Sequence, residues 1–226
     1  MALVERFFDG TATSYDAMVH WATLGIDRLW KRRIVQGIPT DARRVLDLAC
    51  GTGISTLAIA AARPRCDVVG VELRDEYLAV ARGKLARAPN PRVSLVLSRA
   101  EDFASTAPFD CITSSYLAKY ADLPRLIAQN RAMLVPGGVL LMHDFTLPPG
   151  AFLRATWRGY FAVMQQTVAR ALPSWHEIYH GLPALIERTR WLEELPPLLR
   201  AEGFVDVRVE YLTLCGSALV HARAPQ

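Results

Sequence analysis

Residues 45–53 read Val-Leu-Asp-Leu-Ala-Cys-Gly-Thr-Gly, and this stretch decides which fold we expect for the chain. A short aliphatic run enters a Gly-x-Gly turn, and an alanine-rich helix is expected to begin at Ile54 directly after it. Glycines at such a turn let the backbone bend sharply and let a ligand approach it closely. Glu72 stands at the end of the next predicted strand, where an acid can bond both hydroxyls of an adenosine ribose.

The alternation of strand and helix extends beyond this stretch. The apolar runs are rich in β-branched residues and do not alternate strictly, which is typical of strands covered on both faces. Alternation at this spacing predicts an α/β fold with a doubly wound, mostly parallel, Rossmann-like sheet of seven strands. We expect strands at 45–48, 67–72, 93–97, 110–114 and 138–143, helices at 54–62, 75–88 and 123–134, and a terminal antiparallel strand pair at 204–211 and 212–222.

One domain, residues 1–226, accounts for the whole chain. The alternation of strand and helix ends at Pro148-Pro149-Gly150. After it come a long amphipathic stretch at 151–172 and a proline- and aromatic-rich segment to Leu182. A further helix is expected at about 185–201. We therefore predict an N-terminal helical lid at 1–40, a cofactor-binding core at 43–147, a lid insertion at 151–184, and a C-terminal helix with strands at 185–226.

Composition excludes several classes of protein. The chain of 226 residues is 51% hydrophobic and 21% charged, which excludes bulk disorder. Its net charge of +4 comes from interleaved acids and bases, and the basic run 31–33 predicts a solvated helix end and no nucleic-acid partner. No apolar run approaches the roughly 18 residues of a membrane span.

The cysteines and the first residues bear on the compartment. Four cysteines are scattered without a C-x-x-C pair, which argues against a zinc knuckle or a disulfide framework. Residues 1–10 carry charged side chains and do not resemble a secretory signal. We therefore expect a cytoplasmic protein in a reducing environment.

Asp47 distinguishes between two kinds of ligand for the glycine turn. It is a carboxylate in a buried strand, and such a charge is costly unless a cation compensates it. A pyrophosphate would be repelled there, whereas the α-ammonium and sulfonium of S-adenosylmethionine would be attracted. Thr56 also occupies the place of the third glycine of G-x-G-x-x-G. An alternative stays open, in which Asp47 is a hydrogen-bond acceptor that fixes the loop, and both roles are compatible.

The sequence resembles the class I S-adenosylmethionine-dependent methyltransferases, and among them the C-methyltransferases of ubiquinone and menaquinone biosynthesis. The resemblance spans nearly the whole chain. Its matching segments are the N-terminal block from Phe8 to Lys31, LDLACGTG (46–53), Ala100-Glu101, FDCIT (109–113), LVPGGVLL (134–141), DFTLP (144–148) and AEGF (201–204) with Leu212-Thr213.

This resemblance implies an S-adenosylmethionine site. The implied contacts are Thr52 and the amides around Gly51 and Gly53 at the methionine end, Glu72 at the ribose, Leu73 against the adenine, Arg99 and Ala100 along the adenine edge, and Ser115 where the fourth strand meets the cofactor.

Departures from the family pattern cluster near the expected acceptor pocket. Arg99 stands where the family usually has Asp or Asn. Residues 115–120, Ser-Tyr-Leu-Ala-Lys-Tyr, replace its Asn-Phe-Gly-Leu-Arg-Asn segment, so that Lys119 falls near the family's arginine. Val19 and Asp27 replace an asparagine and a histidine of the N-terminal block.

The resemblance implies methylation of a ring carbon of a small aromatic or quinol substrate, such as a demethylmenaquinol or a ubiquinone precursor. Two alternatives stay open: an O- or N-methyltransferase of another small aromatic metabolite, and an inactive S-adenosylmethionine-binding partner subunit. A homodimer is also left open, as is peripheral membrane contact through residues 151–172, whose ordinary alternative is a lid packed on the domain.

A quinol that takes a methyl group on its ring must lose a phenol proton, so a base or a polarised water is expected. Ligands bind at the carboxyl ends of the strands in such sheets, which makes Tyr116, Lys119, His143 and Asp144 candidates, with Tyr15 from the N-terminal lid. Each has a structural alternative. The tyrosines could be packing aromatics, Lys119 a solvent-exposed side chain, and His143 and Asp144 groups that cap a strand end and a loop.

Residues 176–180, His-Glu-Ile-Tyr-His, match the H-E-x-x-H zinc-protease motif. That chemistry needs a continuous helix and a third ligand. We expect Pro173 and the Gly-Leu-Pro at 181–183 to interrupt the helix, so we predict no metal site. An alternative role for His176 and Tyr179 is to form a wall of the acceptor pocket.

Overall fold

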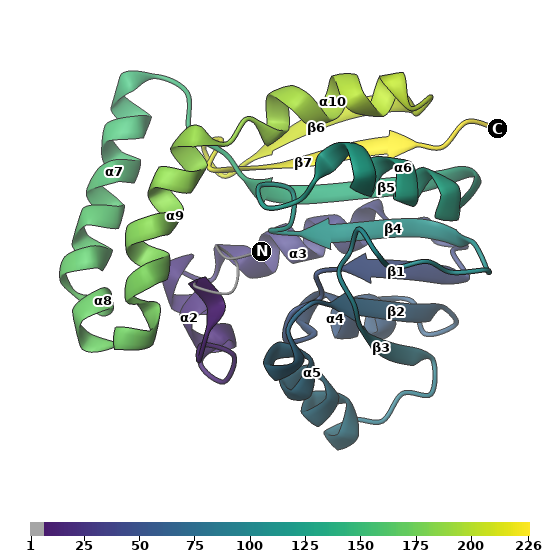
Figure 1. Ribbon diagram of the computed structural model, residues 1–226, viewed down its shortest axis with the longest axis horizontal. Coiled ribbons are helices and arrows are strands. Elements are labelled where there is room, and N and C mark those ends of the chain that lie inside the picture. The colour runs from purple at the N-terminus through teal and green to yellow at the C-terminus, as the bar shows by residue number, and fades with distance from the viewer. Residues whose placement is uncertain (1–6) are drawn as a thin grey trace.

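The computed structural model describes residues 7–226, and its strands form one seven-stranded sheet (Figure 1). The strands are β1 (Arg44–Leu48), β2 (Asp67–Glu72), β3 (Val93–Leu97), β4 (Phe109–Ser115), β5 (Leu134–Phe145), β6 (Val205–Leu212) and β7 (Ser217–Arg223). Their order is β3-β2-β1-β4-β5-β7-β6. Strands β1 to β5 pair in parallel, and β7 is antiparallel to β5 and β6. The predicted α/β sheet with a C-terminal antiparallel pair is confirmed.

Helices cover both faces of the sheet. They are α3 (Ile26–Gly37), α4 (Ile54–Ala62) and α5 (Asp75–Arg87) on one face, and α6 (Leu123–Met133) and α10 (Trp191–Ala201) on the other. On the first face Ile34 of α3 belongs to one apolar cluster with Val45. On the second, Leu126 of α6 belongs to another with Leu46. Neighbouring residues of β1 thus point into opposite cores, which explains why Val45 and Leu46 are both apolar and do not alternate with polar residues.

A third group of helices lies beyond the carboxyl ends of the parallel strands. It comprises α2 (Tyr15–Ala22), α7 (Ala151–Gln166), α8 (Val168–Ala171), the 3₁₀ turn η1 (Pro173–Trp175) and α9 (His176–Arg188). The arrowheads of β1 and β4 point toward these helices in Figure 1. They share their own apolar cluster, which includes Met18, Phe161 and Trp175. We call this group the lid helices; residues 1–6 of the predicted N-terminal lid lie outside the described residues.

The helices between residues 151 and 201 correct three expectations. The predicted single stretch at 151–172 is interrupted at Thr167, which separates α7 from α8. The proline- and aromatic-rich segment up to Leu182, in which we expected the prolines to interrupt the helix, is largely α9, and this helix continues through Pro183. The predicted helix at 185–201 is divided, because Thr189 is extended with φ −71° and ψ 141° between α9 and α10.

The continuity of α9 through Pro183 has a local cause. Proline has no N–H to donate to the carbonyl four residues earlier, which belongs to Tyr179. The side-chain amide of Gln165 on α7 donates to that carbonyl instead, at 3.0 Å. Because the freed acceptor is satisfied from a neighbouring helix, the helix tolerates its proline.

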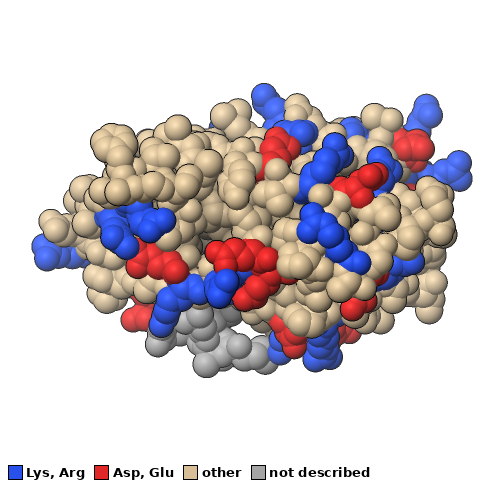
Figure 2. Space-filling view, turned by 90° about the horizontal axis from the view of Figure 1, so that it is seen from above, with Lys and Arg blue, Asp and Glu red and all other residues tan. Residues whose placement is uncertain are grey.

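Charged side chains are mixed over the face shown in Figure 2, where lysines and arginines alternate with aspartates and glutamates. A stretch at the upper left of that view carries almost no charge. None of the helices in residues 7–226 is long and apolar enough to cross a membrane.

Candidate functional site

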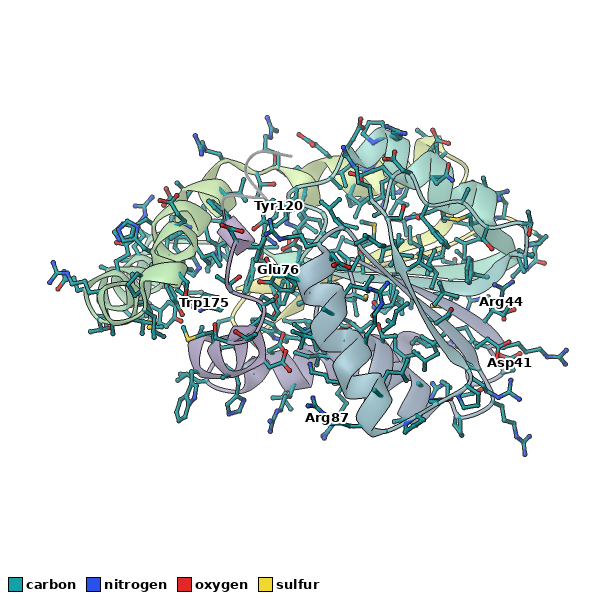
Figure 3. The ribbon with its side chains drawn as sticks, turned by 60° about the horizontal axis from the view of Figure 1, so that its bottom comes forward. Asp41, Arg44, Glu76, Arg87, Tyr120 and Trp175 are labelled. Carbon is teal, nitrogen blue, oxygen red and sulfur yellow. The ribbon has the colours of Figure 1, made fainter. Side chains whose placement is uncertain are left out.

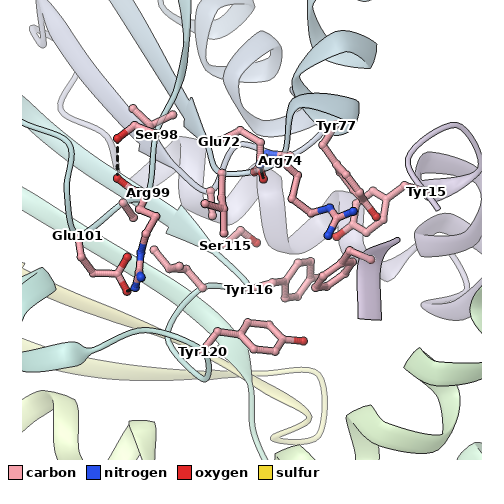
Figure 4. Close-up of a pocket in the computed structure, with 17 residues that line it drawn as sticks. Tyr15, Glu72, Arg74, Tyr77, Ser98, Arg99, Glu101, Ser115, Tyr116 and Tyr120 are labelled. Atoms are coloured by element: carbon pink, nitrogen blue, oxygen red, sulfur yellow. Dashed lines mark hydrogen bonds and ion pairs between the residues drawn. The ribbon is translucent and has the colours of Figure 1, made fainter. Parts of the chain in front are cut away.

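A first cavity opens at the carboxyl ends of β1, β2 and β4 (Figure 4). It brings together most of the cofactor residues that the sequence predicted, although they come from distant parts of the chain. Those that line it are Gly51, Glu72, Leu73, Arg99, Ala100 and Ser115, whereas Asp47, Thr52 and Gly53 do not line it.

Glu72 is the polar centre of this cavity. Its carboxylate accepts hydrogen bonds from the backbone amides of Gly51 and Arg74, each at 2.9 Å. Burial raises the pKa of Glu72, and the two amides oppose that rise. A carboxylate offers about four lone-pair positions, so acceptor capacity remains toward the cavity. The arrangement fits a ligand that presents a pair of hydroxyls, as the ribose of S-adenosylmethionine does.

The glycine turn takes a backbone conformation that few residues adopt. Ala49, Gly51 and Gly53 have φ values of 54°, 58° and 81°. A Cβ atom at Gly53 would lie 3.1 Å from the Cβ of Ala81 on α5. The glycine therefore serves both the left-handed turn and the close packing of α5 against it.

Thr52 is held by the N-terminal part of the chain. Its hydroxyl donates to Asp16 of α2 at 2.5 Å, and its carbonyl accepts from Lys84 of α5 at 2.9 Å. Asp16 and Lys84 are themselves an ion pair. This three-residue contact ties α2 to the glycine turn, so the implied contact of Thr52 with the methionine end stays a prediction.

Asp47 is buried within the fold, behind the cavity wall. Its two carboxylate oxygens accept from the hydroxyls of Thr56, at 2.7 Å, and Thr113, at 3.0 Å. Burial raises its pKa to about 6, which the two hydroxyls oppose. The structure thus shows the hydrogen-bond acceptor role that the sequence left open, and corrects the expectation that this carboxylate faces the ligand directly. An electrostatic effect on a bound cation stays a prediction.

Three further wall residues were missed by the sequence reasoning. Arg74 and Tyr77 belong to the start of α5, and Glu101 follows the predicted Arg99 and Ala100. The Nη2 atom of Arg99 lies 3.5 Å from Oε1 of Glu101. The quoted Ala100-Glu101 pair was the available signal for Glu101, whereas nothing in the sequence marked Tyr77.

A second cavity of about 320 Å³ lies between the sheet and the lid helices. Most of its wall is aromatic or aliphatic, and Figure 3 shows Trp175 on the lid side and Tyr120 nearer the centre of the molecule. Phe8, Tyr15, Tyr116 and Tyr120 line both cavities. These four rings mark the boundary across which a group could pass from a ligand in the first cavity to a ligand in the second.

Lys119 corrects the expectation of a solvent-exposed side chain. It lines the second cavity but is buried, and its Nζ atom lies 2.6 Å from Oδ1 of Asp144 and 3.0 Å from the carbonyl of Tyr116. Burial lowers the pKa of Lys119, and Asp144 opposes that effect. Asp144 lines neither cavity, so the structure gives it contact with the wall residue Lys119 and not with a ligand.

Tyr116 and Tyr15 line both cavities, and their catalytic roles stay predictions. The hydroxyl of Tyr116 donates to Asp27 of α3 at 2.6 Å, and Tyr15 stacks on Trp175 of the lid. Burial raises the pKa values of both phenols well above 10. At neutral pH both are therefore neutral phenols, which suits a hydrogen-bond donor better than a base.

His143 is fully buried and lines neither cavity. Its Nδ1 atom lies 3.0 Å from the hydroxyl of Ser115, and its Nε2 atom has no hydrogen-bond partner among residues 7–226. Burial lowers its pKa well below the usual value. The ring is therefore neutral and lies behind Ser115, away from both cavities.

The H-E-x-x-H motif lies on a continuous helix, contrary to our expectation. The rings of His176 and His180 stack at 4.2 Å on α9, and both residues are exposed. The described part of the chain holds no group of three His, Cys, Asp or Glu side chains that could bind a metal ion. Of the two residues proposed for the pocket wall, Tyr179 lines the second cavity and His176 does not.

Known methyltransferases are similar to this chain in sequence. The sequence model of the ubiE/COQ5 methyltransferase family matches residues 1–224. A demethylmenaquinone methyltransferase of Thermus thermophilus is 31% identical over 217 residues, which cover 95% of this chain and 97% of that protein. A ubiquinone/menaquinone biosynthesis C-methyltransferase of Syntrophotalea carbinolica is 32% identical over 210 residues, 91% of this chain and 87% of that protein.

Solved structures share the fold at lower identity. A Haemonchus contortus phosphoethanolamine N-methyltransferase 2, bound to S-adenosylhomocysteine, aligns with a TM-score of 0.72 at 17% identity, over 99% of this chain and 59% of that chain. An O-methyltransferase family protein of Burkholderia thailandensis aligns with a TM-score of 0.67 at 18% identity, over 98% and 62% of the two chains.

Proposed function

Because the chain belongs to the ubiE/COQ5 methyltransferase family, and is therefore an S-adenosylmethionine-dependent methyltransferase, we propose that it methylates a ring carbon of a demethylated quinol. The cofactor occupies the first cavity, with its ribose at Glu72. The quinol ring occupies the second cavity and approaches the methyl group at the boundary formed by the four shared aromatic rings.

The observation that carries the proposal is the pairing of the two cavities. The first is lined by four charged residues, Glu72, Arg74, Arg99 and Glu101, and the second is aromatic and aliphatic over most of its wall. A volume of about 320 Å³ falls in the range of small-molecule sites. Positioning the two reactants in line is the main contribution an enzyme makes to a reaction of this kind.

The experiment uses a short-chain, water-soluble demethylated quinol kept reduced under anaerobic conditions. Purified protein, S-adenosylmethionine and this acceptor are expected to give a product heavier by one methyl group, with the new methyl on a ring carbon by NMR. A methyl ether would support an O-methyltransferase instead. Binding of S-adenosylmethionine without turnover of any phenol, amine or quinol would support an inactive partner subunit.

We also propose that the protein binds peripherally to a bilayer around the mouth of the second cavity. Leu24 lines that cavity and is nevertheless 79% exposed, which places it at the opening. Leu214 is 74% exposed and follows Thr213 of the same wall. Both leucines have positive φ values, 51° and 52°, in turns that bulky residues rarely form. Strained turns that present apolar side chains are a reason to look for a binding role.

The neighbouring surface has the composition of an interfacial patch. Trp21 and Leu29 are large, exposed apolar residues, and Arg28 and Arg32 are exposed on the same helix as Leu29. Tryptophan, leucine and arginine together are typical of surfaces that lie in the headgroup region of an anionic membrane. An acceptor dissolved in the bilayer could then enter the cavity from its apolar side. A cytoplasmic location and a homodimer stay predictions.

A further inference from the structure

Tyr116 is held in an unusual conformation at the boundary of the two cavities. Its φ of +65° is rare for a bulky side chain. Three contacts hold it there: its amide donates to the carbonyl of His143 at 2.8 Å, its ring stacks on Phe145 at 4.7 Å, and its hydroxyl donates to Asp27 at 2.6 Å. Backbone strain that is fixed from several sides is concentrated at functional sites.

Asp27 lies directly behind this tyrosine. The residue is 3% exposed and lines neither cavity. Its Oδ1 atom accepts from both the Tyr116 hydroxyl and the Lys31 ammonium, the latter at 2.8 Å. The ammonium compensates the charge of the buried carboxylate. Among the described residues, Tyr116 is therefore the link between this carboxylate and the cavity in which the acceptor would bind.

The other candidate bases are less suitable. The amine of Lys119 donates to Asp144 and to the carbonyl of Tyr116, so toward the cavity it can act as a donor. His143 has no surface on either cavity. Tyr15 is a phenol with no carboxylate bonded to its hydroxyl among the contacts of the described chain. Asp27 behind Tyr116 is thus the arrangement that combines a phenol of the cavity wall with a carboxylate bonded to its hydroxyl.

We propose that Asp27 receives the hydroxyl proton of the acceptor through Tyr116, which acts as a relay. The proposal rests on the proposed quinol methylation and adds the path of its proton. Tyr116 is the catalytic residue that touches the acceptor oxygen, and Asp27 acts through it.

The atoms balance in two stages. The bound cofactor supplies a methyl group with a sulfur leaving group. As the ring carbon takes that methyl, the adjacent hydroxyl becomes strongly acidic; its proton moves to the Tyr116 oxygen while the proton of Tyr116 moves to Asp27. The ring is then a ketone with one hydrogen and one methyl on the same carbon. That hydrogen leaves to water, and the proton held at Asp27 returns through Tyr116 to the ketone oxygen, so that one proton is released in total.

The test compares two acceptors. One is a neutral short-chain quinol, and the other carries electron-withdrawing fluorines so that its hydroxyl is already ionised at the assay pH. With the neutral acceptor, Asp27→Asn and Tyr116→Phe are each expected to lower kcat about hundredfold, the usual contribution of a general base. With the ionised acceptor, the same variants should lose less than about fivefold, because the relay is not needed.

Two controls separate this role from a structural one. Asp27→Asn leaves Lys31 without its anion, whereas Tyr116→Phe keeps that ion pair, so both are measured and checked by thermal unfolding. Calorimetry should give an unchanged Kd for S-adenosylmethionine in Asp27→Asn, because Asp27 lines neither cavity. The Kd of Tyr116→Phe is measured as well, so that kcat is compared at saturating cofactor. Tyr120→Phe, which lines both cavities and does not contact Asp27, is expected to change turnover of the two acceptors by the same factor.

The double variant should be no slower than the slower single variant, since both residues serve one path. Equal losses with both acceptors, or an unimpaired Tyr116→Phe, would overturn the relay while leaving the quinol function intact. A wild-type protein that binds S-adenosylmethionine but methylates neither acceptor would instead overturn the proposed function, and the relay with it.

Discussion

The ammonium of Lys119 lies 2.6 Å from Oδ1 of Asp144, and neither side chain is exposed to solvent by more than 2%. Asp144 also accepts from the backbone amides of Lys119 and Phe145. The pair fixes the end of β5 against the loop that carries Tyr116 and Tyr120, and so it shapes the wall of the second cavity. The positive charge also lies 4.5 Å from the centre of the Tyr120 ring, which contributes a cation–π attraction.

Removing one partner of this pair is expected to destabilise the fold strongly. Asp144→Ala leaves a buried ammonium without its anion and should lower the free energy of unfolding by about 3–5 kcal/mol. The double variant Lys119→Met/Asp144→Asn should recover most of that loss, since it leaves no unpaired charge. Urea denaturation measures both. A single variant as stable as the wild type would contradict a buried, energetically coupled pair.

Glu72 should control cofactor affinity. In Glu72→Gln the side-chain amide cannot accept from both Gly51 and Arg74 at once, so one backbone N–H faces another donor. Hydrogen bonds to a charged group contribute about 1.5–3 kcal/mol, so the Kd for S-adenosylmethionine should rise between about tenfold and a hundredfold. Calorimetry measures it.

The matched control for this prediction is Glu76→Gln. Glu76 is in the first turn of α5, pairs with Arg74 at 2.7 Å, and does not line the first cavity. Its substitution is expected to change the Kd by less than about threefold, as for a partly exposed ion pair. Equal effects of the two substitutions would show that the loop as a whole, and not the carboxylate of Glu72, determines affinity.

The sheet and the place of Glu72 at the end of β2 could be predicted because their signals are local. β-branched runs, the glycine turn and the proline breaks each occupy a few consecutive residues, and the observed bounds of α4, β2 and β3 agree with the prediction to the residue. Residues 54–62 illustrate this, since glycine precedes the helix and Pro64 follows it.

The continuity of α9, the burial of Lys119 and the contact of Asp27 with Tyr116 could not be predicted, because they depend on contacts between distant residues. Pro183 indicates a helix end unless Gln165 of another helix satisfies the carbonyl of Tyr179. Lys119 was expected at the surface because its buried partner, Asp144, is 25 residues away in the sequence. Asp27 was recognised only as a departure from a family pattern, and its bond to Tyr116 spans 89 residues.

Membrane binding should depend on the leucines at the mouth of the second cavity. The double variant Leu24→Asp/Leu214→Asp removes two exposed apolar side chains, each of which can contribute about 1.5–3 kcal/mol when buried. Co-sedimentation with phosphatidylglycerol vesicles in the absence of substrate should therefore fall at least about tenfold. Wild-type binding should be weaker to phosphatidylcholine vesicles and should decrease with salt, because Arg28 and Arg32 contribute electrostatically.

Leu97→Asp and Val205→Asp are the matched controls for membrane binding. Both residues are large, apolar and about half exposed, but they lie at the end of β3 and the start of β6, away from the mouth. They are expected to leave vesicle binding unchanged. If they reduce it as much as the leucine variant does, the attraction is not specific to the cavity mouth.

Asp47 links the stability of the fold to pH. Its pKa is about 6 in the folded state because of burial, against about 3.9 for an unperturbed aspartate. Between those values the folded state binds more protons than the unfolded state, so the free energy of unfolding should fall as the pH rises through this window. The loss is about 3 kcal/mol and stays constant at higher pH. The charge of nearby Lys31 opposes the rise in the pKa of Asp47 and so reduces this loss, whereas the charge of Glu72 adds to both.

Asp47→Asn keeps the shape of the side chain and should lack this dependence of stability on pH, so the difference between wild type and variant is measured by urea denaturation from pH 4 to pH 7.

Cofactor binding then separates the two roles of the Asp47 carboxylate. If its charge attracts the sulfonium and ammonium through the turn, at an effective dielectric constant of about 20 and a distance of about 10 Å, the variant should bind S-adenosylmethionine about tenfold more weakly at pH 7. Wild-type affinity should also rise with pH as Asp47 ionises, and the variant should show no such rise from this group. An unchanged Kd in a variant that has lost the stability slope would leave Asp47 as a buried acceptor for Thr56 and Thr113 alone, since a charge that the cofactor senses cannot be removed without changing its affinity.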